Sequence, residues 1–133
     1  MMQTFLPYAD FSKSAKSLDY RRLGKQRVEC LQLLRGQWAN HPAYKMWDGH
    51  QYQLACYGII ICDEWLLLGY NDSCYDKILV EREKFTDTGL PRWFGNPAFH
   101  KAHRSNLLEK DFGFYRNKFP EDKPGLPYIW PVK

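Results

Sequence analysis

A basic cluster around a single acid is the part of this sequence best suited to chemistry. It comprises Arg21, Arg22, Lys25, Gln26, Arg27 and Glu29. A helix that turns about 100° per residue places four of these on one face: Arg22, Lys25, Gln26 and Glu29. Several cations around one carboxylate suit an anionic polymer such as nucleic acid, and they leave the carboxylate available for chemistry once the polymer is bound.

The same spacing also has an ordinary structural interpretation. Lys25 and Glu29 are four residues apart, so they can form an exposed ion pair that stabilises a helix by only about 0.3–0.5 kcal/mol. Arg27 falls on the apolar side of the helix, where it either extends to water or is buried against a partner. Gly24, inside the helix, predicts that another backbone or a ligand approaches closely there.

A second polar cluster comprises His100, Lys101, His103, Arg104, Ser105 and Asn106. The histidines and Arg104 share one face of a predicted helix, and phosphate recognition requires such donors to converge on non-bridging oxygens. The histidines can equally be structural or capping residues. We predict no metal and no cofactor, because catalytic metal sites usually need three protein ligands and no Cys, Asp or Glu lies at a matching spacing. His41 is a further predicted nucleic-acid contact.

Aromatic residues make up 17% of the chain, a high share for a domain of 133 residues. Trp93 lies in a segment rich in Gly and Pro. An exposed aromatic ring beside cations suits stacking on an unpaired or flipped base. The alternative is that the ring fills a small core. We include Trp93 among the predicted nucleic-acid contacts.

The predicted fold is all-α, a single compact helical domain over residues 1–133 with a long irregular C-terminal segment rich in Pro and aromatic residues. Capping residues and apolar periodicity predict helices up to residue 17 and over 19–38, 42–47, 51–68, 72–85 and 98–110. The chain has a net charge of +4 and no apolar run of the roughly 18 residues that a membrane span requires. Because the first residues also lack the pattern of a signal peptide, we expect a cytoplasmic protein.

Five segments resemble a known family: Gln3–Pro7, Leu18–Glu29, Asn40–Trp47, Gly95–Leu108 and Leu126–Pro131. They are similar to a group of small bacterial and phage proteins related to the pyrimidine-dimer DNA glycosylases of the endonuclease V type. The resemblance implies base excision, in which the enzyme cuts the glycosidic bond of a damaged nucleotide and then the strand, through a Schiff base. The implied partner is DNA, as a duplex with a flipped base rather than a single strand.

The family's catalytic residues do not carry over one by one. Characterised members use the amine of an N-terminal threonine, whereas Thr4 follows Met1, Met2 and Gln3, so we expect Thr4 not to be a free N-terminus. They also place a glutamate directly after the arginine that matches Arg21. This chain has Arg22 at that position.

We therefore predict substitutes for the two missing groups. Glu29 would activate water or stabilise the oxocarbenium-like transition state, and Lys25 would attack the anomeric carbon if neighbouring cations lower its pKa. His100 or His103 would protonate the leaving base or bind phosphate. Four arginines would hold phosphates: Arg21, Arg22, Arg27 and Arg104.

The leading prediction is thus a DNA glycosylase, with or without abasic-site lyase activity, that excises a damaged or modified base. One alternative is a non-catalytic nucleic-acid-binding protein, which leaves Glu29 without a role because a carboxylate repels phosphate. A second alternative is a metal-dependent hydrolase that uses His100 and His103.

Overall fold

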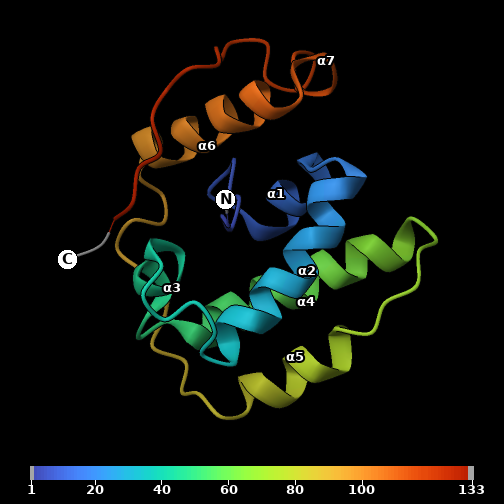
Figure 1. The fold of residues 1–133 in the computed structure, drawn as a ribbon, viewed down its shortest axis with the longest axis vertical. Coiled ribbons are helices and arrows are strands. Elements are labelled where there is room, and N and C mark those ends of the chain that lie inside the picture. Colours follow the sequence, from blue (N-terminus) through green and yellow to red (C-terminus); the bar gives the residue numbers. More distant parts are fainter. Residues whose placement is uncertain (1, 132–133) are drawn as a thin grey trace.

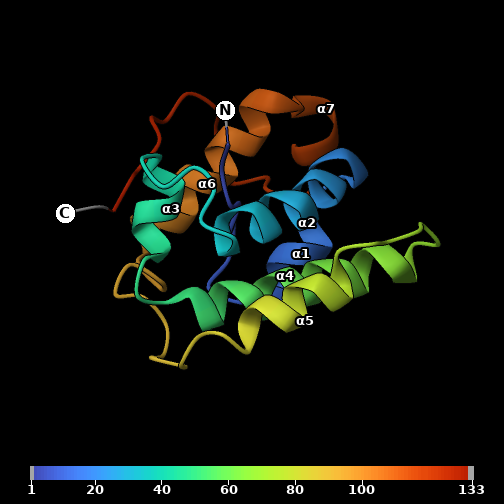
Figure 2. The ribbon, with the colours of Figure 1, turned by 60° about the horizontal axis from the view of Figure 1, so that its bottom comes forward.

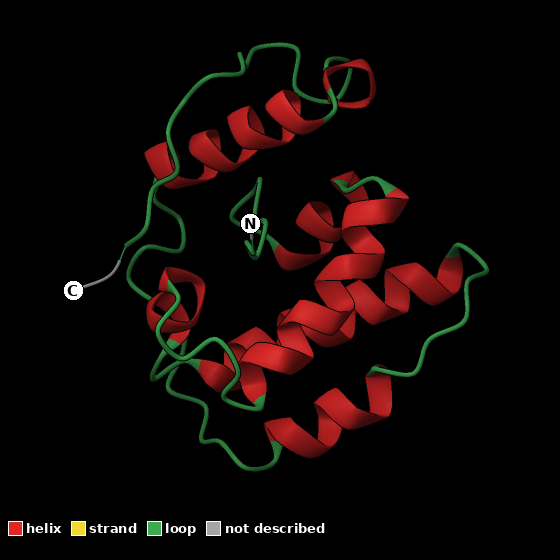
Figure 3. Ribbon diagram, viewed as in Figure 1, coloured by secondary structure: helices red, strands yellow, loops and turns green. Residues whose placement is uncertain are grey.

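The computed structural model describes residues 2–131 and contains seven helices and no strand within that range (Figures 1 and 3). The helices are α1 (Phe11–Ser17), α2 (Tyr20–Leu34), α3 (Pro42–Trp47), α4 (Gln51–Leu67), α5 (Tyr75–Arg82), α6 (Pro97–Lys110) and α7 (Phe112–Tyr115). The prediction of an all-α fold with an irregular C-terminal segment is confirmed. None of the helices in the described part is long and apolar enough to cross a membrane.

Side-chain caps begin several of the helices where the sequence predicted them. The side chains of Asp10 and Asn96 accept hydrogen bonds from backbone N–H groups in the first turns of α1 and α6, which satisfies donors that a helix start leaves unpaired. Asp19 occupies the N-cap of α2 but makes no side-chain cap. Its carboxylate instead accepts a hydrogen bond from the hydroxyl of Tyr115, the last residue of α7 and far from α2 in the sequence.

Helix α2 ends four residues earlier than the predicted boundary at Trp38. Gly36 has φ 82° and Trp38 has φ 62°, and both values lie in the left-handed region that ends a right-handed helix. The segment from 35 to 40 is therefore a turn that leads into α3, and the prediction of a helix to Trp38 was wrong.

The helices pack in layers around a buried N-terminal segment. Helices α4 and α5 lie beneath α1 and α2, and α2 contacts both α4 and α5 (Figure 2). Helix α6 lies on the opposite side of α2, and residues 2–7 run between these two helices (Figure 1). The segment after α7 returns past α6, where the N–H of Leu126 donates to the hydroxyl of Ser105 at 3.0 Å. This arrangement brings α2 and the end of α6 to the two sides of one groove.

Candidate active site between α2 and α6

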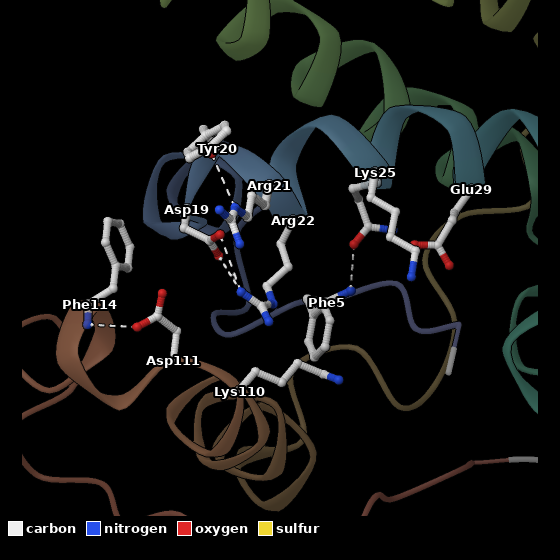
Figure 4. Close-up of a pocket in the computed structure, with 11 residues that line it drawn as sticks. Phe5, Asp19, Tyr20, Arg21, Arg22, Lys25, Glu29, Lys110, Asp111 and Phe114 are labelled. Atoms are coloured by element: carbon white, nitrogen blue, oxygen red, sulfur yellow. Dashed lines mark hydrogen bonds and ion pairs between the residues drawn. The ribbon is translucent and has the colours of Figure 1, made fainter.

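A cluster of charged side chains lines a groove of about 530 Å³ between α2 and the junction of α6 with α7 (Figure 4). We call it the main groove. Its lining residues are Phe5, Asp19, Tyr20, Arg21, Arg22, Lys25, Gln26, Glu29, Lys110, Asp111 and Phe114. The predicted helix face of Arg22, Lys25, Gln26 and Glu29 therefore opens onto a concave surface, together with Arg21.

Four cations surround the main groove, three from α2 and one from α6. Arg22 lies 3.3 Å from a carboxylate oxygen of Asp19, and Asp19 is also held by Tyr115. Arg21 is exposed and donates to the hydroxyl of Tyr20 at 3.1 Å. Both arginines thus lie at one end of the groove, where they can meet phosphate oxygens, and Arg22 is oriented by the buried Asp19.

Glu29 is the acid at the other end of the main groove, and only 7% of its surface is exposed. Burial raises the pKa of Glu29, and the nearby Lys25 ammonium opposes this shift in part. No ion pair within 4 Å joins Glu29 to Lys25 in the described chain, although both side chains reach into the same part of the groove (Figure 4). The exposed helix ion pair considered from the spacing is therefore absent from the structure.

Lys110 is the cation of the main groove that the sequence did not single out. It is the last residue of α6 and faces α2 across the main groove (Figure 4). Partial desolvation lowers the pKa of Lys110, the positive charges of Arg22 and Lys25 lower it further, and Glu29 opposes the change. In the sequence, a lysine at this position is typical of a helix C-terminus, where it interacts with the helix dipole. Only the tertiary arrangement, which places the end of α6 across the main groove from α2, reveals its second environment.

A smaller pocket of about 380 Å³ adjoins the main groove, and we call it the side pocket. Its lining residues are Met2, Lys25, Glu29, Gln32, Trp38 and His41. Lys25 and Glu29 thus line both spaces. His41 is half-buried, caps α3 by accepting the N–H of Ala43 at Nδ1 (3.0 Å), and has its pKa lowered by burial.

Several residues predicted to act on nucleic acid instead fasten the buried N-terminal segment. Gln26 accepts the N–H of Phe5 at 2.9 Å. His103 accepts the N–H of Leu6 at Nδ1 (2.8 Å), and Nδ1 of His100 lies 2.7 Å from the carbonyl oxygen of the same residue. Extended backbone cannot satisfy its own polar groups in a core, so these side chains replace the missing strand partners.

Both histidines lie in the core and outside the linings of the main groove and the side pocket. His103 is fully buried, and burial, followed by the neighbouring His100, lowers its pKa to about 3. The second ring nitrogen of His100 accepts the N–H of Gly95 at 2.9 Å. Their hydrogen bonds are thus directed at backbone groups, and we do not carry the two residues into the proposed mechanism.

The rest of the second polar cluster also lies away from both spaces. Arg104 donates to Asp122 at 2.8 Å and to the carbonyl oxygen of Pro7 at 2.9 Å. Ser105 holds the C-terminal segment, and Asn106 donates to the backbone of its own helix. Lys101 is exposed on α6. None of these side chains extends the main groove, and those of Arg104 and Ser105 stabilise the packing of α6.

Arg27 and Trp93 have structural partners as well. Arg27 forms an ion pair with Asp72, and its guanidinium lies 4.5 Å from the ring centre of Trp65. Burial against a partner was one of the two alternatives for Arg27. Trp93 is 8% exposed and donates from its indole to the carbonyl oxygen of Met46 at 2.9 Å. The structure thus shows the core alternative for Trp93.

Two further expectations concern Thr4 and metal ligands. Thr4 is fully buried, and its hydroxyl accepts a hydrogen bond from the indole of Trp47 at 2.9 Å. Between residues 2 and 131, no group of three or more His, Cys, Asp or Glu side chains is placed to hold a metal ion.

Comparison with known proteins identifies a family. A family model described as pyrimidine dimer DNA glycosylase matches residues 2–78, more than half of the 133 residues. The matched region includes all of α2 and therefore Glu29 and the basic face of the main groove, whereas Lys110 lies beyond it. No curated protein and no solved structure matches the chain.

Proposed function

Because the chain belongs to the pyrimidine dimer DNA glycosylase family, we propose that it excises a base from DNA and that it breaks the glycosidic bond beside Glu29. The observation that carries this proposal is the environment of Glu29. A nearly buried carboxylate with a raised pKa lies among four groove cations that suit the DNA backbone. A binding surface alone gains nothing from an acid at this place.

The two arginines at the far end of the main groove would hold the phosphates of the target strand. Arg22 is oriented by its ion pair with the buried Asp19, so it loses less conformational freedom on binding than the exposed Arg21 does. This places the sugar of the bound nucleotide between the arginines and Glu29.

Glu29 would act as the base in the displacement at the anomeric carbon. Its raised pKa makes its carboxylate a better proton acceptor than an ordinary glutamate. It takes one proton from the attacking group as that group bonds to the anomeric carbon. The glycosidic bond breaks, its electron pair leaves with the base, and the proton passes to the departing base.

An amine is the attacking group that the groove best supports. The lowered pKa of Lys110 increases the fraction of uncharged amine at neutral pH. After base release the nitrogen lone pair displaces the sugar ring oxygen, which takes a proton from solvent, and a protonated Schiff base is left. Loss of a neighbouring sugar proton then expels the phosphate on the 3′ side. Lys25, which lies closer to Glu29 along α2, is the second candidate for the same step.

Base release from a duplex that contains a cyclobutane thymine dimer tests the proposal. We expect Glu29→Gln to reduce the single-turnover rate of base release by about 10²–10⁴-fold, the usual contribution of a general acid or base. Glu83→Gln provides the matched control, because the Glu83 side chain is 76% exposed at the end of α5. It should leave the rate unchanged.

Two outcomes would contradict the proposal. One is binding of the dimer duplex without any base release by the wild-type protein. The other is a Glu29→Gln rate equal to that of the wild type and of Glu83→Gln.

A further inference from the structure

A second groove adjoins the main groove at the end that carries the arginines, and the chemistry above gives it no role. It has a volume of about 340 Å³, and we call it the lateral groove. Six of its lining residues are exposed: Lys16, Tyr20, Leu68, Tyr70, Phe114 and Lys118. Building on the proposed base excision, we infer that the lateral groove binds the sugar-phosphate backbone of the DNA that flanks the damaged site on one side.

The lateral groove is a continuation of the main groove. Asp19, Tyr20 and Phe114 line both of them, and Figure 4 shows these three residues at the end of the main groove opposite to Glu29. Tyr20 and Glu29 both belong to α2 and are separated by about 14 Å along its axis, or about four base-pair steps. DNA with its damaged nucleotide beside Glu29 therefore reaches the lateral groove a few nucleotides away from the reacting bond.

The rim of the lateral groove is basic. Lys16 of α1 and Lys118, which follows α7, are both exposed, and Nζ of Lys118 lies 3.5 Å from the carbonyl oxygen of Lys16. Of the acids in the lining, Asp19 is nearly buried and held by the contacts described above, and Glu64 is half-buried. A basic rim suits a polyanion, whereas a two-fold interface with a second copy of the chain would place this basic surface against itself.

The floor of the lateral groove presents aromatic rings that are already oriented. Tyr20 is 52% exposed, and its ring stacks on Tyr70 at a centroid distance of 6.2 Å. Tyr70 in turn stacks on Trp65 at 4.3 Å, which anchors both tyrosines to α4. Nζ of Lys118 lies 4.8 Å from the ring centre of Phe114. Exposed rings beside cations are typical of surfaces that follow a nucleic-acid backbone, because the rings pack on its apolar parts while the cations meet its phosphates.

The salt dependence of DNA binding tests the inference, because each phosphate contact contributes about 0.9 to the slope of log K against log salt concentration. Three duplexes carry a stable abasic analogue. One has about 12 base pairs on each side, and each of the others is cut to about two base pairs on one side, which is shorter than the distance from Glu29 to the lateral groove. Fluorescence anisotropy measures binding to each duplex over a range of salt concentrations.

The double variant Lys16→Ala/Lys118→Ala removes the two cations of the rim. We expect it to lower the salt slope by about 2 on the full-length duplex and on one of the cut duplexes, and to match the wild type on the other. Lys77→Ala is the matched control, because Lys77 is exposed on α5 and lines neither groove. It should match the wild type on all three duplexes.

Two neighbouring leucines at the end of α4 test the apolar part of the lateral groove. Leu68 is 53% exposed and belongs to the lining, whereas Leu67 is 80% exposed and lies outside it. Leu68→Ser should weaken binding by about 5-fold on the two duplexes that contain the required flank. The salt slope should stay unchanged, because an apolar contact releases no counterions. Leu67→Ser should bind as the wild type does.

The inference is overturned if the double lysine variant loses the same slope on all three duplexes or on none. It is also overturned if sedimentation shows a dimer that Leu68→Ser dissociates, because a second copy would then cover the lateral groove. These measurements involve no bond cleavage. A flank-dependent loss without any base release would therefore contradict the proposed function alone, and base release without a flank-dependent loss would contradict only the present inference.

Discussion

His103 shows how a polar residue in this chain serves the fold. It is fully buried, and its Nδ1 accepts the N–H of Leu6, which lies 97 positions away in the sequence. Its Nε2 has no hydrogen-bond partner among the described residues, so the neutral ring holds a buried donor at some cost in stability. Protonation would add a charge to the same apolar site.

The stability of the fold should therefore depend on pH through His103. Its folded-state pKa is about 3, against 6.5 for an unperturbed histidine ring. Below pH 6.5 the imidazole of His103 is protonated in the unfolded chain but stays neutral in the folded chain. The contribution of His103 to the free energy of unfolding is therefore complete above pH 6.5 and decreases as the pH falls toward about 3. The decline is about 1.4 kcal/mol per pH unit, or about 2 kcal/mol by about pH 5.

Urea denaturation of wild type and His103→Gln at about pH 7 and about pH 5 measures this contribution. The variant keeps an acceptor for the N–H of Leu6 but cannot titrate, so the difference between the two proteins should change by about 2 kcal/mol. Parallel pH profiles would show that His103 does not titrate as described. If the variant fails to fold, the NMR titration of the wild-type ring gives the same information.

Residue types alone could not show whether a polar side chain such as His103 binds buried backbone or nucleic acid. Glu29, Arg22 and Lys25 were identified because one helix places them on one face, which is a local property. His100 and His103 also share a helix face, but both form hydrogen bonds with the backbone of Leu6. Leu6 is far away in the sequence and reaches the two histidines only when the chain folds. The same donors that suit a phosphate also suit a buried backbone.

At the scale of elements, Gly24 determines how closely α2 and α4 approach. A Cβ atom at this position would lie 2.8 Å from two ring atoms of Trp65, closer than real Cβ contacts occur. The ring cannot easily withdraw, because its indole donates to the backbone of Asn71, it stacks on Tyr70, and the Arg27 guanidinium lies over it. The close approach at Gly24 is therefore made by the Trp65 side chain and not by the backbone or ligand that the sequence predicted.

Gly24→Ala should consequently destabilise the fold by about 1–2 kcal/mol. The overpacking penalty is about 1–3 kcal/mol, and the better helix propensity of alanine recovers up to about 1 kcal/mol. Chemical denaturation measures the change. Gly113→Ala is the matched control, since a Cβ there meets only a side-chain oxygen at 3.9 Å. A Gly24→Ala protein as stable as wild type would contradict this packing argument.

The starts and ends of helices are predictable from the sequence where neighbouring residues determine them. The start of α3 at Pro42 and of α6 at Pro97 was predictable within one residue, because capping side chains and proline act locally. The end of α2 was missed although the sequence carries a local signal for it, because Gly36 directly follows the C-cap Arg35 with φ 82°, the position at which glycine commonly ends a helix. The short helix α7 was also not predicted, because it lies in the C-terminal segment that was predicted to be irregular.

At the scale of the whole molecule, the main groove depends on the buried N-terminal segment. Residues 2–7 separate α6 from α2 and bind side chains on both (Figure 1). The gap that they maintain places Lys110 opposite the basic face of α2. The basic face was predictable from helical periodicity, whereas the place of Lys110 in the lining of the main groove depends on the tertiary arrangement of α2 and α6.

The central claim is that DNA reacts in the groove between α2 and α6, with Lys110 as the amine. Borohydride reduction of the protein on an abasic-site duplex, followed by peptide mapping with mass spectrometry, tests it most directly. Lys110→Arg keeps the positive charge but removes the nucleophile, and Lys77→Arg on α5 is the exposed control. We predict an adduct on Lys110 that Lys110→Arg abolishes and Lys77→Arg retains. No adduct in the wild-type protein, or an adduct on a residue other than Lys110, would contradict the account.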